Sequence, residues 1–152
     1  MLLFDALVGN NDRHFENWGV LTSPINEFQP FFSPVYDTAR GLFWNDSEDK
    51  IKDRLRCNTE QQIQKYCKLS KPKIGWKDSP KRLAHFDLVE RIVNDEFYIS
   101  RNEAKELFQS TVKERMFTLI DKDFSSLMSS ERIKVIKMCL DYRFQEINKR
   151  IL

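Results

Sequence analysis

The C-terminal segment carries the strongest constraint on the fold of this 152-residue chain, a long stripe of apolar residues at helical spacing. After Ser130, apolar residues recur at intervals of 3, 4, 4, 3 and 4, which is the period of an α-helix with one buried face. We interpret this stripe as a core face and expect the latter half of the chain to be a helical bundle. The stripe consists of Ile133, Ile136, Leu140, Phe144, Ile147 and Ile151.

Three further segments predict helices from about residue 59 onward. Asn58 or Thr59 begins the first, and Ser79-Pro80 supplies an N-cap and first residue for the second. Ser100 and Glu103 form a capping box that begins the third. The apolar residues at helical spacing in these segments are Ile63, Tyr66 and Cys67, then Leu83, Phe86, Val89 and Val93, then Ala104, Phe108, Val112 and Met116.

The N-terminal third predicts a different local structure. Residues 1–8 read as the last turns of an apolar helix that Gly9 ends, and because they begin midway through a helix we expect something to precede them. Residues 18–21 and 31–36 are aromatic or β-branched, and the turn-rich residues 22–26 lie between them. These stretches predict a short β-hairpin, so the expected fold is mainly α with one hairpin.

Glycine usage excludes the common phosphate-binding loops. The chain has only four glycines, and their separation rules out the motifs GxGxxG and GxxxxGK[ST]. They are Gly9, Gly19, Gly41 and Gly75.

Charge and hydropathy exclude further classes. The formal net charge of +2 does not predict direct nucleic-acid binding. The chain has no run of 18 apolar residues, so the sequence predicts no membrane span. Met1-Leu2-Leu3-Phe4 reaches Asp5 without the pattern of a signal peptide. The three cysteines form no CxxC pair and fit reduced thiols, so we expect a cytoplasmic protein.

The polar segment of residues 9–17 carries the candidate chemistry. Asp12 and Asn17 lie between the first helix and the hairpin, and Asp37 follows the second strand. A loop that runs from a helix into a hairpin can turn these side chains toward one cleft. Three oxygen donors without a thiolate suit a hard ion such as Mg²⁺, which usually takes further ligands from water and substrate phosphates.

The same residues resemble a known kinase family. Asp12–Asn17 matches the D-x-x-x-x-N pattern of the protein-kinase catalytic loop, and Tyr36-Asp37 stands where the metal-binding aspartate of D-F-G would be. The sequence of residues 7–20, followed by Ser33-Pro34-Val35-Tyr36-Asp37, resembles the C-terminal domain of HipA-like serine/threonine kinases. These are bacterial enzymes that are often the toxin of a toxin–antitoxin pair. The resemblance is specific over residues 4–45 and extends beyond them only as a helical outline.

The resemblance implies a role for each site residue. Asp12 would accept the proton of the substrate hydroxyl as it attacks the γ-phosphate of ATP, and Asn17 and Asp37 would hold Mg²⁺. His14 and its neighbours through Glu16 and Asn17 would line the nucleotide side of the cleft with Tyr36. The whole chain would form one kinase C-lobe-like domain, with the catalytic loop and hairpin in residues 1–45 and a helical bundle in residues 46–152.

An N-lobe with a phosphate-covering loop is absent from the sequence, so the resemblance implies a catalytic lobe that is inactive without that partner. Further implied partners are a protein substrate with a Ser or Thr acceptor and an antitoxin with a helix-turn-helix DNA-binding domain. Two alternatives stay open. One is a non-catalytic interaction module with a kinase-derived fold, and the other is a phosphoinositide-kinase-like enzyme, because Asp12-Arg13-His14 and Asn17 also match D-R-H-x-x-N.

Four further features of the sequence are interpreted one by one. Arg13 reads as a surface or ion-pair residue, and Arg40 as a partner of a carboxylate or of a substrate phosphate. His85 reads as a structural residue of its helix. The basic stretch of residues 65–82 is either a surface for an acidic partner or a solvated loop; its cations are Lys65, Lys68, Lys71, Lys73, Lys77, Lys81 and Arg82.

Overall fold

The central element is a long C-terminal helix, as the apolar stripe predicts. The structure, a computed structural model, describes residues 1–25, 27–77, 79–95 and 99–152. Helix α7 (Ser130–Ile151) begins where the Ser129 side chain accepts a hydrogen bond from the backbone N–H of Arg132 at 3.1 Å. Its buried face contains every residue of the predicted stripe except Ile133, which is partly buried.

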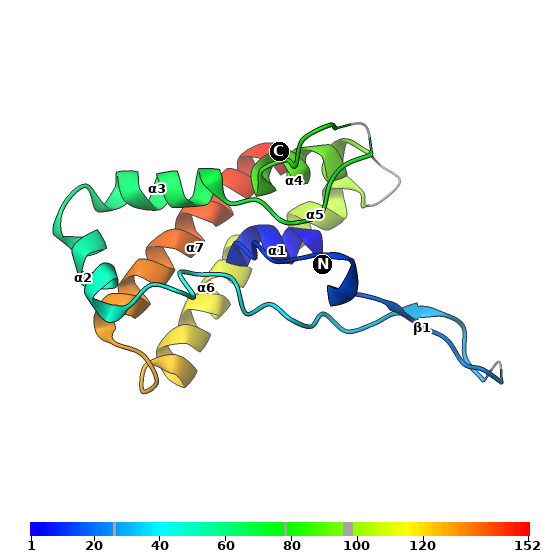
Figure 1. Cartoon of the computed structure of the whole chain (residues 1–152), viewed down its shortest axis with the longest axis horizontal. Coiled ribbons are helices and arrows are strands. Elements are labelled where there is room, and N and C mark those ends of the chain that lie inside the picture. Colours follow the sequence, from blue (N-terminus) through cyan, green and yellow to red (C-terminus); the bar gives the residue numbers. More distant parts are fainter. Residues whose placement is uncertain (26, 78, 96–98) are drawn as a thin grey trace.

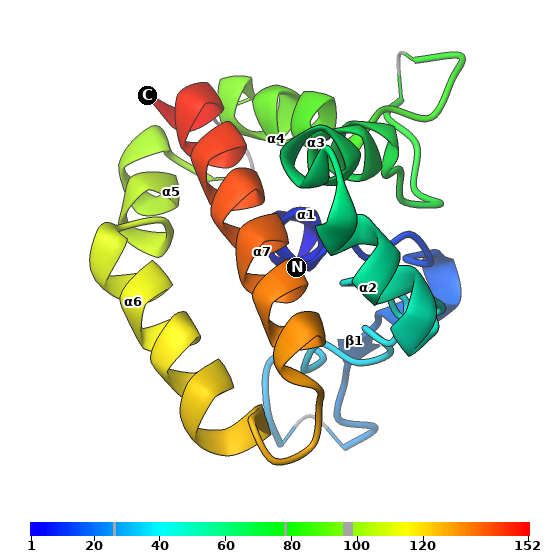
Figure 2. The same cartoon turned by 90° about the vertical axis from the view of Figure 1, so that its left-hand side faces the viewer.

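Shorter helices surround α7 on several sides (Figure 2). Helices α5 and α6 lie along one side of it, α2, α3 and α4 lie on the other, and α1 packs behind it. Helix α6 runs directly into a π-helical turn at Ile120–Phe124. The surrounding helices are α1 (Leu2–Val8), α2 (Glu48–Arg56), α3 (Thr59–Leu69), α4 (His85–Asn94), α5 (Arg101–Leu107) and α6 (Ser110–Leu119).

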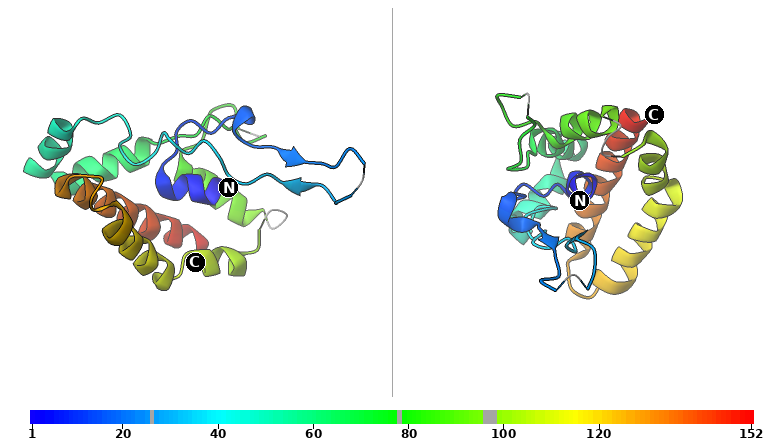
Figure 3. Two further views of the ribbon diagram at one scale, coloured as in Figure 1. Left: turned by 90° about the horizontal axis from the view of Figure 1, so that it is seen from below. Right: turned by 90° about the vertical axis from the view of Figure 1, so that its right-hand side faces the viewer.

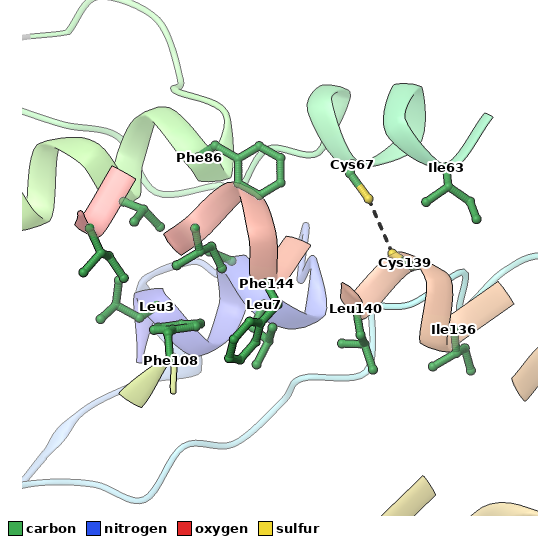
Figure 4. Close-up of a cluster of buried hydrophobic side chains, with 14 of the residues drawn as sticks. Leu3, Leu7, Ile63, Cys67, Phe86, Phe108, Ile136, Cys139, Leu140 and Phe144 are labelled. Carbon is green, nitrogen blue, oxygen red and sulfur yellow. Dashed lines mark hydrogen bonds between the residues drawn. The ribbon is translucent and has the colours of Figure 1, made fainter. Parts of the chain in front are cut away.

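One hydrophobic core joins these helices (Figure 4). Leu3 and Leu7 of α1 meet Phe144 of α7, whose ring lies 5.4 Å from that of Phe108. Cys67 of α3 and Cys139 of α7 bring their sulfur atoms within 3.5 Å. The core therefore fixes α1 against α7, and the candidate site begins directly after α1.

The predicted hairpin forms and projects from the helices (Figures 1 and 3). Strands β1 (Val20–Leu21) and β2 (Phe31–Phe32) pair antiparallel, with Val20 opposite Phe32. Both strands are shorter than the sequence predicts, and the rings of Trp18 and Phe32 stack 6.0 Å apart. The predicted turn includes Asn26, which lies outside the described residues.

Helix α2 is absent from the sequence-based prediction, which places no helix between residue 9 and about residue 59. Its N-terminus carries clear signals, because the Ser47 side chain accepts a hydrogen bond from the backbone N–H of Lys50 and acidic residues occupy the first turn. Only Ile51 is buried, so the helix has no apolar stripe that periodicity could detect.

The predicted start of α4 at Ser79-Pro80 is wrong. The Ser79 hydroxyl donates to the carbonyl of Lys81 at 2.7 Å, and the helix begins at His85 after Ala84. The backbone N–H of His85 donates to the carbonyl of Ser70 at 3.1 Å, so the end of α3 fixes where α4 begins.

The predicted stripe from Ala104 to Met116 belongs to two helices, not to one. The capping box of Ser100 and Glu103 is present and begins α5, as predicted. The chain then turns at Phe108, whose carbonyl accepts a hydrogen bond from Asn148 of α7 at 3.2 Å. This contact with α7 separates α5 from α6.

Candidate active site

The end of α1 determines where the polar segment begins. Gly9 adopts a left-handed conformation with φ of 68°. Arg143 of α7 donates from Nη1 to the carbonyl of Ala6 at 2.8 Å, and a Cβ on Gly9 would lie 2.5 Å from Arg143 Nη2. Both the backbone angle and this close approach require glycine.

Arg13 is the organising residue of the site, and it is fully buried. Its Nε and Nη2 donate to the two carboxylate oxygens of Asp5 at 2.8 and 2.9 Å. Its Nη1 donates to the carbonyls of Asn17 at 2.6 Å and Tyr36 at 2.7 Å. The ion pair with Asp5 raises the pKa of Arg13, and the same guanidinium joins α1, the 3₁₀ turn (Phe15–Asn17) and the segment after β2.

The two predicted metal ligands are in direct contact. The Asn17 amide nitrogen donates to Asp37 Oδ2 at 2.5 Å, and the Asn17 amide oxygen accepts from the backbone N–H of His14 at 3.1 Å. Asp37 has a positive φ of 51°, an uncommon backbone conformation for a residue other than glycine and one that clusters at functional sites. The hairpin thus returns Asp37 to the polar segment of residues 9–17, as the sequence predicts.

Asn10 links Asp12 to Asp37. Its side-chain oxygen accepts from the backbone N–H of Asp12 at 3.1 Å, and its side-chain nitrogen donates to the backbone carbonyl of Asp37 at 3.4 Å. The same nitrogen donates to Asp5 at 3.1 Å. The structure therefore brings Asp12, Asn17 and Asp37 together around Asn10 and Arg13.

Two cations hold the Asp12 carboxylate. Arg40 Nε lies 3.0 Å from Asp12 Oδ2, and Lys73 Nζ forms an ion pair with Oδ1. The hydrogen bond from Lys73, followed by the charge of Arg40, holds the pKa of Asp12 below its ordinary value. The carboxylate is therefore ionised at neutral pH.

The predicted nucleotide-lining residues stabilise the 3₁₀ turn. His14 Nδ1 accepts from the backbone N–H of Glu16 at 3.3 Å, and the Tyr36 hydroxyl donates to the Glu16 carbonyl at 2.9 Å. The Glu16 carboxylate is exposed, with its Oε2 3.7 Å from His14 Nδ1. These contacts order the turn that carries Asn17, and the nucleotide-lining role stays a prediction.

Sequence reasoning missed three residues of the site, namely Asp5, Asn10 and Lys73. Asn10 lies in the polar segment of residues 9–17, and Asp5 lies in the apolar helix before it, where a carboxylate was a signal. Lys73 comes from the loop after α3, and nothing near it in the sequence points to Asp12.

The donor set fits Mg²⁺ better than a transition metal. In the parts of the chain that the structure describes, no group of three or more His, Cys, Asp or Glu side chains could hold a metal ion. Asn17 and Asp37 instead offer an amide oxygen and a carboxylate, and the amide oxygen also accepts a hydrogen bond from the backbone N–H of His14. Magnesium commonly accepts one or two such ligands and completes its shell with water and phosphate oxygens.

Comparison with known proteins identifies the fold. No protein-family model and no curated protein matches the sequence. Across the described ranges, no helix is both long and apolar enough to span a membrane. The structure is similar to the crystal structure of a Helicobacter pylori proinflammatory kinase, CtkA, with a TM-score of 0.74 and 20% sequence identity over 97% of this chain and 50% of that one. The chain thus has a kinase-like fold and spans half the length of that kinase.

Proposed function

We propose that this chain is the catalytic, metal-binding lobe of a HipA-like serine/threonine protein kinase. The observation that carries the proposal is the meeting of Asp12, Asn17 and Asp37 around one buried scaffold in a kinase-like fold. The order of these residues along the chain is also that of the kinase catalytic and metal-binding motifs.

Each residue has one task in this proposal. Asp12 accepts the proton of a serine or threonine hydroxyl as the hydroxyl oxygen attacks the γ-phosphorus of ATP. Asn17 and Asp37 supply protein oxygen ligands for Mg²⁺, which when bound neutralises charge on the β- and γ-phosphates. Arg13 keeps the two ligands at a fixed separation through the carbonyls of Asn17 and Tyr36.

The proposed enzyme needs a second lobe to hold the nucleotide. The four glycines of the chain do not form a phosphate-covering loop, and the chain matches only half of the solved kinase. We propose that an N-lobe is supplied by the same polypeptide or by a separate one. A toxin–antitoxin setting in the cytoplasm, with a helix-turn-helix antitoxin, belongs to the same proposal.

The test combines this chain with candidate N-lobes and measures transfer of ³²P from ATP to protein and lipid acceptors. We expect Mg²⁺-dependent transfer to serine or threonine, abolished by Asp12→Ala and by Asp37→Ala. Glu27→Ala, in the exposed hairpin, is the control and should leave transfer unchanged. Transfer that survives Asp12→Ala would contradict the role of Asp12, and transfer to lipid alone would favour the phosphoinositide-kinase alternative.

A non-catalytic interaction module is the second candidate. The observation that favours it is the engagement of both Asp12 carboxylate oxygens by Arg40 and Lys73. Isothermal titration with Mg²⁺ and ATP separates the candidates, because the module would show no binding even with an N-lobe present.

A further inference from the structure

The loop after α3 is anchored to the catalytic loop. The Ser70 hydroxyl donates to Asn11 Oδ1 at 2.6 Å, and the backbone N–H of Lys71 donates to the same oxygen at 3.1 Å. Ser70 is buried, so this contact fixes the start of the loop. Two residues after Lys71, Lys73 forms an ion pair with the Asp12 carboxylate. One cation of the basic stretch therefore belongs to the candidate active site.

Arg40 contacts the other oxygen of the same carboxylate. Its backbone carbonyl accepts from the N–H of Asn11 at 3.2 Å, and its guanidinium carbon lies 5.1 Å from the centre of the Trp44 ring. Asn11 therefore positions both cation-bearing segments. The side chains of Arg40 and Lys73 are 49% and 43% exposed, whereas that of Asp12 is 12% exposed.

Two cations face the one Asp12 carboxylate, and the side chains of both are about half exposed. Each therefore keeps N–H donors that Asp12 does not use, beside the proposed proton acceptor. A hydroxyl bound to Asp12 would place the phosphorus it attacks close to both cations. Phosphoryl transfer is accelerated mainly by positive groups on the equatorial oxygens of the transferred phosphate.

We infer, on the basis of the proposed function, that Lys73 and Arg40 bind the phosphoryl group being transferred. Before the phosphoryl group is present, both cations are paired with Asp12. In the transfer step the acceptor oxygen bonds to the γ-phosphorus as the bond to the bridging oxygen of ADP breaks. The electron pair of that bond leaves with ADP, and the hydroxyl proton passes to Asp12. Lys73 and Arg40 turn from Asp12 to the phosphoryl oxygens during the same step.

A binding experiment tests the site without any kinase assay. Inorganic phosphate is titrated into the chain at low ionic strength, and binding is followed by NMR and by calorimetry. Asp12→Asn removes the competing charge and should tighten phosphate binding roughly tenfold. Adding Lys73→Gln to Asp12→Asn should reverse this gain, whereas Lys77→Gln, an exposed lysine of the same loop, should preserve it.

A second measurement uses the chain combined with an N-lobe. Lys73→Gln should lower kcat roughly 10²-fold with little change in the KM for ATP, as expected for a group that acts on the transition state. Phosphate binding that is equal in all four proteins, or a kcat unaffected by Lys73→Gln, would overturn the inference. Neither result touches the roles of Asn17 and Asp37, whose failure would instead appear as loss of Mg²⁺-dependent ATP binding.

Discussion

The Arg13 guanidinium can be buried because all of its donating nitrogens have partners. Asp5 accepts from Nε and Nη2, and two backbone carbonyls accept from Nη1. Such pairing offsets the cost of removing the charge from water, and a lysine could not reproduce the planar fork. The sequence indicates that Arg13 could form an ion pair but not that the pair is buried, because burial depends on α1 and the hairpin closing over it.

A single-residue test concerns Gly9. Gly9→Ala should lower the free energy of unfolding by about 2 kcal/mol or more, because alanine is strained at positive φ and its methyl group would contact the Arg143 guanidinium. Urea unfolding of the purified chain measures the change.

Gly75→Ala provides the matched control. A Cβ at Gly75 would have no neighbour within 4 Å, and the backbone there has no positive φ. Its effect should stay within about 0.5 kcal/mol. Equal effects of the two substitutions would show that the contact between Gly9 and Arg143 does not constrain the chain.

At the scale of elements, a helix is predictable where its signal, an apolar stripe or a cap, lies within the segment itself. Helix α7 is predictable because its apolar stripe faces a core along its whole length. Helix α2 buries only Ile51, and the start of α4 depends on Ser70, so local pattern misses the first and misplaces the second. Tertiary contacts decided these elements, and a single sequence does not display them.

Some residues of the candidate site can likewise be predicted from the sequence and others cannot. Asp12, Asn17 and Asp37 can be proposed from sequence because the order of a helix, a loop and a hairpin brings them together. Lys73 cannot, because its contact with Asp12 requires α3 to end beside Asn11.

The segment that follows Asp37 depends on Phe43 as its anchor. Phe43 is fully buried, its ring lies 4.1 Å from that of Tyr66, and Arg54 stacks on it at 4.8 Å. Phe43→Leu should therefore cost about 1–2 kcal/mol of stability and speed proteolysis between residues 37 and 47. Phe15→Leu, at a ring that is 77% exposed, is the control and should change neither quantity. Unchanged cleavage in Phe43→Leu would show that the segment is held by other contacts.

At the scale of the whole molecule, Arg143 and His85 form a buried polar centre between helices. Arg143 of α7 donates to the end of α1, and its guanidinium carbon lies 5.9 Å from the Tyr66 ring of α3 and 5.7 Å from the Phe86 ring of α4. His85, the first residue of α4, is 1% exposed. Protonation of His85 would add a second buried positive charge where four helices meet.

The stability of the whole fold should therefore depend on the titration of His85. Burial and the charge of Arg143 lower the pKa of His85 to about 3, whereas an unfolded chain has a histidine pKa of about 6.5. Between about pH 6.5 and about pH 3 the unfolded state binds a proton on this histidine that the native state does not. The free energy of unfolding therefore falls as the pH drops through this range. The histidine alone should lower the free energy of unfolding by about 2 kcal/mol between about pH 7.5 and about pH 5. The loss should continue to grow below about pH 5 and level off near pH 3. Urea unfolding at each pH should show this loss in the wild type and not in His85→Gln or His85→Phe, and equal pH dependence in all three would mean that His85 is protonated in the native state.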